Sequence, residues 1–235
     1  MSDIVLSCRG VIKGYKKGHP VLNGLDLDVP AGKIFGLLGP NGCGKSTLIK
    51  LISGLLIKEA GSIKICGIDQ GDITNGLVSY LPERPCFNFG LKVIQIIDYY
   101  NDFFADFDKE LALKMISDLS IDKNATIKTL SKGTKEKVQL VLVMARRARL
   151  YLLDEPIAGV DPAARDYILG TIIGSYNQNA SVLITTHLIH DIEPVLDEFA
   201  FMSPGGVITH QGDCDQIRQG TGKSIDELFR EVFRC

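Results

Sequence analysis

The chain has 235 residues, of which 45% are hydrophobic and 23% are charged, and its formal net charge at pH 7 is −2. This length is sufficient for a buried core and fits one large domain or two lobes. Because basic residues are not in excess, nucleic acid is not expected as the main partner. The start, MSDIVLSCRG, lacks the apolar core of a signal peptide, and no apolar run approaches the roughly 18 residues that cross a bilayer. We therefore expect a cytoplasmic chain that reaches a membrane only through partners.

Residues 3–38 are predicted to be rich in β-strands. DIVLSCRGVI and LDLDV alternate apolar and polar residues, which is typical of half-buried antiparallel strands. KIFGLLG is a nearly continuous apolar run that ends at glycine, as expected for a strand buried on both faces. A helix is predicted to begin near Lys45, with one apolar stripe made of Leu48, Leu51, Ile52 and Leu55.

Short strands are predicted at GSIKICGID and GLVSYLPERP, and residues 87–149 are predicted to form an inserted, mainly helical lobe. RLYLLDEP and SVLITTH then resemble buried parallel strands, and EFAFMSPGGVITHQGD two strands joined by a glycine turn. SIDELFREVF predicts a short amphipathic helix capped by Ser224. Alternating strands and helices indicate an α/β sheet. The predicted division is a core of residues 1–86 and 150–215, the helical lobe, and a tail of residues 216–235.

GPNGCGKST, residues 39–47, fits the pattern G-x-x-x-x-G-K-[ST] between a predicted strand and a predicted helix. Its glycines allow several backbone N–H groups to point at one anion, and the helix N-terminus adds partial positive charge. Lys45 is expected to reach the β- and γ-phosphates of a nucleotide, and Ser46 to bind Mg²⁺. An ordinary glycine-rich turn is the alternative, which nine matching residues in this context argue against. The predicted nucleotide-binding residues here are Gly39, Asn41, Gly42, Cys43, Gly44, Lys45, Ser46 and Thr47.

LYLLDEP, residues 150–156, predicts a buried strand with two carboxylates at its end. Asp154 is expected to hold the Mg²⁺ shell, and Glu155 to polarise the water that attacks the γ-phosphate. If this acidic pair stood alone, the simpler interpretation would be that it caps a helix. The phosphate-binding loop at residues 39–47, the P-loop, favours the catalytic interpretation. His187 ends the strand that carries TTH. It is added to the candidate catalytic residues, because the strand ends of such a sheet converge on the phosphates.

The cysteines form no CxxC pair and have no zinc-ligand spacing with histidine. They are interpreted as free thiols of a reducing compartment: Cys8, Cys43, Cys66, Cys86, Cys214 and Cys235. Cys43 differs from the others because it lies beside a predicted helix start, a position that lowers the pKa of a thiol.

With these motifs in this order, the sequence resembles the nucleotide-binding subunit of an ATP-binding-cassette (ABC) transporter, and in particular short bacterial exporter-type ATPases. The resemblance covers nearly the whole chain and consists of Tyr15, residues 39–47, YLPERP at 80–85, LSKGT at 130–134, LLDEP at 152–156, AGVD at 158–161, and His187. It implies a P-loop NTPase core with an N-terminal antiparallel β subdomain and an inserted helical subdomain, and it implies ATP and Mg²⁺ as ligands.

The resemblance implies that LSKGT is the family's signature, which binds the γ-phosphate of an ATP held by the opposite subunit. Its members are Ser131, Lys132, Gly133 and Thr134. The hydroxyl of Ser131, the unobstructed N–H of Gly133 and the dipole of the helix that begins here suit this role. Without the other motifs, the same stretch would be interpreted as a solvated, lysine-rich helix start. Lys132 replaces the family's first glycine, and Thr134 replaces its glutamine.

Three other residues take their expected roles from the resemblance. Glu83 stands where the family has a glutamine that joins Mg²⁺ to the membrane partner, and its carboxylate is still a hard-oxygen ligand. Tyr15 is expected to stack on adenine, unless it is an ordinary strand tyrosine. Asp161 is expected to pair the two subunits and align Glu155. In the family, the region that corresponds to residues 86–107 receives the membrane subunit. The alternative is that Phe103, Phe104 and Phe107 form the lobe's own core, and this is expected for most of these three residues.

One P-loop and one signature imply a head-to-tail dimer, formed by two copies or with a related ATPase, which binds two ATP molecules. The expected function is energy coupling in an ABC transporter, more specifically an exporter, at the inner face of the membrane through transmembrane partner subunits. The alternative is a soluble ABC ATPase, for example of the iron–sulfur cluster assembly type. Translation-associated and chromosome-associated members fit badly, because the second cassette and the long heptad insertions of those proteins are missing.

Overall fold

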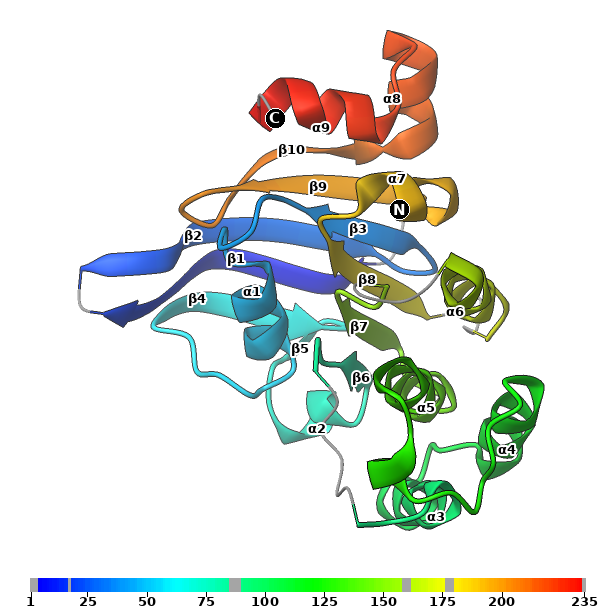
Figure 1. Cartoon of the computed structure of the whole chain (residues 1–235). Helices are drawn as coiled ribbons and strands as arrows, with labels where there is room; N and C mark the ends of the chain where they lie inside the picture. Colours follow the sequence, from blue (N-terminus) through cyan, green and yellow to red (C-terminus); the bar gives the residue numbers. More distant parts are fainter. Residues whose placement is uncertain (1–3, 17, 85–89, 158–161, 176–179, 234–235) are drawn as a thin grey trace.

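The computed structural model describes residues 4–16, 18–84, 90–157, 162–175 and 180–233. Within these residues the strands form two sheets (Figure 1). The first is antiparallel, in the order β2-β1-β4-β5, and consists of β1 (Ile4–Lys16), β2 (His19–Pro30), β4 (Ala60–Ile65) and β5 (Ile68–Asp69). The predicted N-terminal antiparallel subdomain is therefore confirmed.

The second sheet has the strand order β10-β9-β3-β8-β7-β6. Its strands are β3 (Ile34–Leu38), β6 (Val78–Leu81), β7 (Leu150–Asp154), β8 (Ser181–Thr186), β9 (Glu198–Ser203) and β10 (Val207–Asp213). The pairs from β9 to β6 are parallel, and β10 pairs antiparallel with β9 around the predicted glycine turn. Because the parallel strands run in one direction, the chain segments that follow β3, β7 and β8 emerge at the same edge.

The parallel strands are buried on both faces, as their continuous apolar runs predict. All five residues of β3 are buried. Phe35 and Leu37 belong to a cluster shared with the first sheet and α1 (Lys45–Ile52), while Ile34 and Leu38 belong to a cluster shared with α5 (Lys132–Met144). Alternate side chains of one strand thus fix a layer on each side of the sheet.

The remaining helices lie beside the sheets or beyond α5, which separates two of them from the second sheet (Figure 1). They are α2 (Asp72–Asn75), α3 (Val93–Phe103), α4 (Lys109–Asp118), α6 (Pro162–Ser175), α7 (Ile189–Ile192), α8 (Cys214–Thr221) and α9 (Ile225–Phe233), with 3-10 turns at Ile127–Thr129 and Glu193–Val195. In the part of the chain that the structure describes, no helix is both long and apolar enough to span a membrane. The division of the chain into a core, a helical lobe and a tail stays a prediction.

The aromatic side chains of the α3 region are divided between core and surface. Phe107 is buried and Phe104 is half-buried, as expected for a lobe's own core. Phe103 is 68% exposed, and its ring stacks on the exposed ring of Tyr99 at 5.8 Å. Most of the three phenylalanines thus lie in the core as expected, and Phe103 is the exception, because the last turn of α3 directs it outward, away from the core side of the helix.

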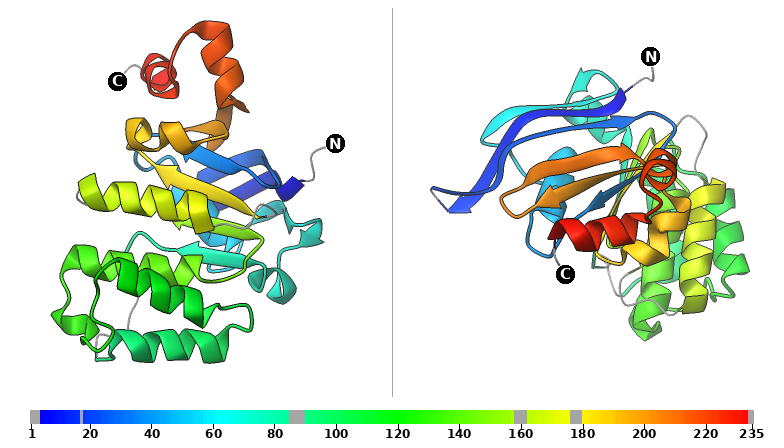
Figure 2. Two further views of the ribbon diagram at one scale, coloured as in Figure 1. Left: turned by 90° about the vertical axis from the view of Figure 1, so that its right-hand side faces the viewer. Right: turned by 90° about the horizontal axis from the view of Figure 1, so that it is seen from above.

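The C-terminal residues form two helices, α8 and α9, that pack on the second sheet. Figure 2 shows α8 and α9 at the end of the molecule opposite to α3 and α4. The predicted Ser224 cap is confirmed, because the Glu227 N–H donates to Ser224 Oγ at 3.1 Å and the Ser224 N–H donates to Glu227 Oε2 at 2.8 Å. Phe229 contacts the β9 residue Phe201 edge to face at 5.4 Å. The helix α8 was not predicted from the sequence.

Candidate functional site

The P-loop, residues 39–47, connects β3 to α1 as the sequence predicts. Gly42 and Gly44 have φ angles of 80° and 114°, a region that favours glycine. A Cβ atom on Gly39 would lie 2.4 Å from the Met202 carbonyl oxygen, so the start of the loop is packed against the end of β9. These glycines let the backbone turn sharply and present its N–H groups at the start of α1.

Lys45 is buried beneath this loop. Its ammonium donates to the carbonyl oxygens of Gly39 at 2.7 Å and of Pro40 at 3.2 Å, and the residue is 6% exposed. Among the described residues, its hydrogen-bond partners are neutral carbonyl oxygens. Such a lysine favours an anion nearby, because a negative charge would offset its desolvation.

Cys43 does not have the activated thiol that its place beside a helix start predicted. The residue is 1% exposed and lies in the apolar cluster beneath the P-loop. Burial raises the pKa of its thiol, and the opposing effect of the Lys45 charge is smaller. This expectation is therefore wrong, because desolvation outweighs the helix start.

Asp154 lies at the end of β7, directly opposite Thr185 of β8. Its Oδ1 accepts hydrogen bonds from Ser46 Oγ at 3.0 Å and from Thr185 Oγ1 at 2.7 Å, and the residue is 2% exposed. The end of β7 and the start of α1 thus bring together two of the three predicted Mg²⁺ ligands, Ser46 and Asp154. Thr185 was missed in the sequence, although it belongs to the TTH segment that supplied His187.

Glu155 follows Asp154 with a left-handed φ of 52°, which is uncommon for a residue other than glycine. Its N–H donates to the Thr185 carbonyl oxygen at 2.9 Å. Its carboxylate accepts from Thr186 Oγ1 at 3.0 Å and contacts His187 Nδ1 at 3.0 Å. The strained backbone is therefore held by β8, and it places the carboxylate between two side chains of the same strand end. Thr186 was also missed in the sequence.

These groups line one open cavity of about 530 Å³, called here the P-loop cavity. Its lining residues are Tyr15, Val21, Asn41, Gly42, Gly44, Lys45, Ser46, Thr47, Glu83, Glu155 and His187. Tyr15 is 61% exposed, and its hydroxyl lies 3.3 Å from Thr47 Oγ1. A flat ring anchored beside a cationic loop suits a planar base joined to phosphates. Of the predicted P-loop residues, Gly39 and Cys43 are packed beneath the loop instead.

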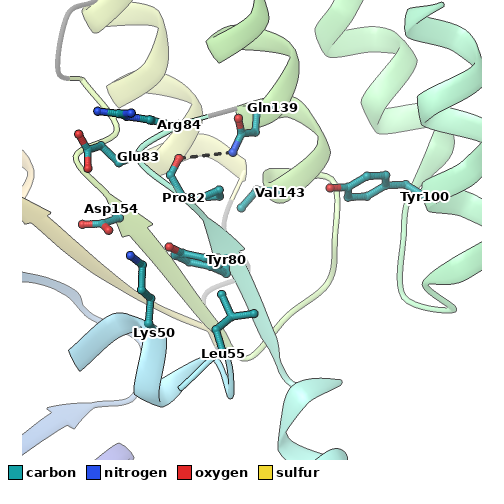
Figure 3. A pocket seen from close by; sticks show the side chains of 10 residues that line it. All are labelled: Lys50, Leu55, Tyr80, Pro82, Glu83, Arg84, Tyr100, Gln139, Val143 and Asp154. Atoms are coloured by element: carbon teal, nitrogen blue, oxygen red, sulfur yellow. Dashed lines mark hydrogen bonds between the residues drawn. The ribbon is translucent and has the colours of Figure 1, made fainter. Parts of the chain in front are cut away.

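Glu83 also lines a larger neighbouring cavity of about 650 Å³, called here the side cavity (Figure 3). Its lining residues are Lys50, Leu55, Tyr80, Pro82, Glu83, Arg84, Tyr100, Gln139, Val143 and Asp154. The buried Gln139 of α5 donates from Nε2 to the Pro82 carbonyl oxygen at 3.4 Å, as the dashed line in Figure 3 marks. The segment that carries Glu83 is thereby joined to the helix that begins at LSKGT.

The LSKGT segment forms the start of α5. Ser131 is the N-cap, and its Oγ accepts from the Thr134 N–H at 3.1 Å. Lys132 is exposed, and a Cβ on Gly133 would meet no atom within 4 Å. The segment therefore offers an open helix N-terminus. Its residues are not among those that line the P-loop cavity of the same chain. Asp161 lies outside the described residues.

The residues beside the P-loop cavity fit a magnesium ion by their chemistry. The hydroxyl of Ser46 and the carboxylates of Asp154 and Glu83 are hard oxygen donors, which Mg²⁺ prefers. Among the described residues there is no cluster of three or more histidine, cysteine or acidic side chains arranged around a metal. A magnesium ion at this place would take ligands from some of these three side chains and complete its shell with water and phosphate oxygens.

The chain is similar to known proteins both in sequence and in fold. The family model described as "ABC transporter" matches residues 22–158. The chain is 30% identical to the ABC transporter ATP-binding protein YtrB of Bacillus subtilis (strain 168), over 86% of this chain and 70% of that protein. It is 26% identical to the Nod factor export ATP-binding protein I of Rhizobium meliloti (strain 1021), over 96% of this chain and 70% of that protein. A solved ATP-binding subunit of an ABC transporter superposes with a TM-score of 0.86 at 28% identity, covering 97% of this chain and 99% of that one.

Proposed function

Because the chain belongs to the ABC transporter family, we propose that it is an ATP-hydrolysing subunit that supplies energy to a membrane transporter. The observation that carries this proposal is the position of Glu155. Its carboxylate lines the P-loop cavity and is held at 3.0 Å by both Thr186 and His187. A positioned carboxylate beside a phosphate-binding loop is what hydrolysis requires and what simple nucleotide binding does not.

ATP binding is assigned to the P-loop cavity. The phosphates would lie over the N–H groups of the loop and the start of α1, with the ammonium of Lys45 against the β- and γ-phosphates. Tyr15 would stack on the adenine ring. This contact uses the face of the base and does not read the hydrogen-bonding groups at its edge. Ser46, Asp154 and Glu83 would hold Mg²⁺, which supplies charge neutralisation of the phosphate oxygens when bound.

Glu155 would orient and polarise the attacking water. The water oxygen forms a bond to the γ-phosphorus while the bond from that phosphorus to the ADP oxygen breaks, and the water proton is drawn toward the carboxylate. Thr186 and His187 limit the rotation of this carboxylate, so that its geometry is set before substrate arrives. The products are ADP and inorganic phosphate.

The active unit is proposed to be a head-to-tail dimer with two ATP molecules between the subunits. Each chain contributes one P-loop cavity and one open α5 N-terminus, whose residues Ser131 to Thr134 are not among those that line its own cavity. In such a dimer Ser131, Gly133 and Thr134 of one subunit would contact the γ-phosphate bound by the other. ATP would close the dimer, and loss of phosphate would remove these contacts and let it open.

The side cavity is proposed as the docking site of the membrane subunit, which would hold this chain at the inner face of the membrane. The cavity lies between the Glu83 segment, the buried Gln139 of α5 and Tyr100 of α3 (Figure 3). The hydrogen bond from Gln139 to Pro82 would carry movement between the docking site and the signature helix. The transport direction is proposed to be export, supported by the similarity to the Nod factor export protein.

A tagged copy of the chain, purified from solubilised native membranes, tests the transport role. The proposal predicts a multi-span membrane protein at stoichiometric yield, identified by mass spectrometry. Recovery of soluble partners alone, under conditions in which a known transporter complex survives, would instead support a soluble ABC ATPase, such as one that serves iron–sulfur cluster assembly. The purified chain is expected to hydrolyse ATP in the presence of Mg²⁺ in both cases.

A further inference from the structure

We propose that the ion pair between Arg165 of α6 and Asp191 of α7 positions His187 for ATP hydrolysis. Neither residue of the pair is among those that line the P-loop cavity. The pair acts instead by holding the chain segment that directly follows His187. The inference deepens the proposed function and rests on it, because it assumes that Glu155 orients the attacking water.

His187 lies just beyond the last residue of its strand. The strand β8 ends at Thr186, and the side chain of His187 is 45% exposed. Among the described residues, the hydrogen-bond partner of its ring is Glu155. The sheet therefore fixes the position of Thr186 but not that of the histidine. What holds His187 against Glu155 is to be found in the segment that follows, residues 188–195.

Leu188, the first residue of this segment, is linked to both contacts of the Glu155 carboxylate. Its N–H donates to Thr186 Oγ1 at 3.0 Å, and the same hydroxyl donates to Glu155 Oε2 at 3.0 Å. Leu188 is also the chain neighbour of His187, whose Nδ1 lies 3.0 Å from the carboxylate. A shift of Leu188 would therefore disturb both side chains that hold Glu155.

The helix α7, which comes next, is a single turn of four residues and is too short to hold itself in place. Its apolar side chains, Ile189 and Ile192, are buried in a cluster that also contains side chains of α6. Its Asp191 carboxylate accepts a hydrogen bond from Arg165 Nη1 at 2.6 Å. The two charged side chains are 29% and 28% exposed, so water screens this pair less than a fully exposed one.

The helix α6 provides the fixed point for this pair. It has 14 residues, contacts α5, and buries Ile168 and Ile172 in the same apolar cluster. A long helix with buried side chains opens and shifts less readily than a single turn. Arg165 therefore connects a well-anchored helix to the short turn that follows His187. Figure 1 shows α7 between α6 and the C-terminal helices α8 and α9.

The far end of the segment has an anchor of its own. Glu193 is 8% exposed, and its carboxylate accepts from Arg218 Nε at 3.4 Å and from two N–H groups at the start of α9, at 2.8 and 3.2 Å. This anchor would keep α7 in the fold when the ion pair with α6 is removed. Loss of the pair is therefore expected to loosen the part of the segment nearest His187 without unfolding the protein.

The alternative is that the pair only stabilises the packing of α6 against α7. Partial burial gives this alternative a physical basis, because breaking a buried ion pair leaves a desolvated charge behind. The two interpretations differ in what a variant changes. A packing role lowers Tm and leaves the kcat of each folded molecule unchanged. A positioning role lowers kcat and leaves nucleotide affinity unchanged.

The test measures kcat at saturating ATP and Mg²⁺ with the purified chain, normalised to the folded fraction determined by circular dichroism. Asp191→Asn and Arg165→Gln are each expected to lower kcat about tenfold, because small displacements of a catalytic group have large effects on rate. Both variants are expected to bind a fluorescent ADP like the parent. The exchange variant, Arg165→Asp with Asp191→Arg, is expected to recover most of the lost activity. Arg9→Gln breaks a 2.6 Å ion pair on the first sheet and is the matched control, expected to retain the parent kcat.

A double-mutant cycle shows whether the pair acts through the histidine. In a His187→Ala background, Asp191→Asn is expected to lower kcat by about threefold or less, because the side chain that the pair positions is gone. A parent-like kcat in both pair variants, an equal loss in Arg9→Gln, or a loss that is undiminished in the His187→Ala background would each overturn the proposal. If the parent itself does not hydrolyse ATP, the proposed function fails, whereas hydrolysis by the parent at a rate that both pair variants match would overturn this inference alone.

Discussion

The carboxylate of Glu155 and the Nδ1 atom of His187 meet at 3.0 Å, across the neighbouring parallel strands β7 and β8. The histidine side chain is 45% exposed, whereas that of Glu155 is 12% exposed. The exposed imidazole therefore covers a largely buried carboxylate that lines the P-loop cavity. In the proposed function, His187 would hold Glu155 in position for the water and the γ-phosphate.

His187→Ala is expected to lower the kcat for ATP hydrolysis by about 10²-fold, because the carboxylate would lose a positioning contact. ATP affinity is expected to change little, because the P-loop contacts are untouched. Steady-state hydrolysis together with equilibrium nucleotide binding checks both parts. His210→Ala removes an exposed histidine of β10 and serves as the control. Equal activity of the His187→Ala and His210→Ala variants would show that this histidine plays no part in hydrolysis.

Thr185→Val is expected to weaken the response of hydrolysis to Mg²⁺. The hydroxyl of Thr185 donates to Asp154 at 2.7 Å, and loss of such a supporting bond typically costs about tenfold or more in metal affinity. The Mg²⁺ concentration for half-maximal activity is therefore expected to rise about tenfold. Thr209→Val removes a strand hydroxyl outside the site and is expected to leave this concentration unchanged. The same Mg²⁺ response in both variants would contradict the assignment of Asp154 to the ion.

The Thr185 and Thr186 contacts illustrate what the sequence could not reveal. The P-loop was predictable because its strand, turn and helix are local and its glycines have a direct conformational reason. The threonines become visible only once β7 and β8 are adjacent and in register, with Asp154 opposite Thr185. The sequence does show two hydroxyl residues before His187 at the end of an apolar strand. It does not show which carboxylates these hydroxyls would contact, because that depends on the order of the strands.

Two other differences have equally specific causes. The position of Cys43 at a helix start predicts a lowered thiol pKa, but the thiol is 1% exposed and so tightly packed under the P-loop that a Cβ atom on Gly39 would lie 2.8 Å from its Sγ. The helix α8 has the sequence CDQIRQGT, with few apolar residues, and so gave no clear periodic pattern. Its start is fixed by Asp213, whose Oδ1 accepts from two N–H groups at 3.0 Å, those of Asp215 and Gln216.

Glu136→Gln is expected to stabilise the protein at alkaline pH. Burial raises the pKa of Glu136, partly opposed by Lys132, and its Oε2 is buried without a hydrogen-bond partner among the described residues. Above this raised pKa, Glu136 is ionised in the folded state, and its desolvated carboxylate destabilises that state. Below the unfolded-state pKa of about 4.3, Glu136 is protonated in both states and this destabilisation disappears. The variant is therefore expected to raise Tm by about 1–3 °C at pH 8 and not at pH 4.

Calorimetry across this pH range checks the prediction. Glu110→Gln is a suitable contrast, because Glu110 is exposed in the first turn of α4, where a helix N-terminus favours the carboxylate. That variant is expected to lower Tm slightly at pH 8. A loss of stability in Glu136→Gln at pH 8 would show that the ionised form of Glu136 is stabilised in the folded protein.

The most direct test of ATP hydrolysis by a head-to-tail dimer is the oligomeric state of Glu155→Gln with ATP and Mg²⁺, measured by light scattering during size-exclusion chromatography. The variant is expected to bind ATP and to hydrolyse it about 10²-fold or more slowly than the parent. It is expected to elute as a dimer with ATP and as a monomer with ADP. Hydrolysis at the parent rate would contradict the assignment of Glu155, and a monomer at saturating ATP would contradict the shared site.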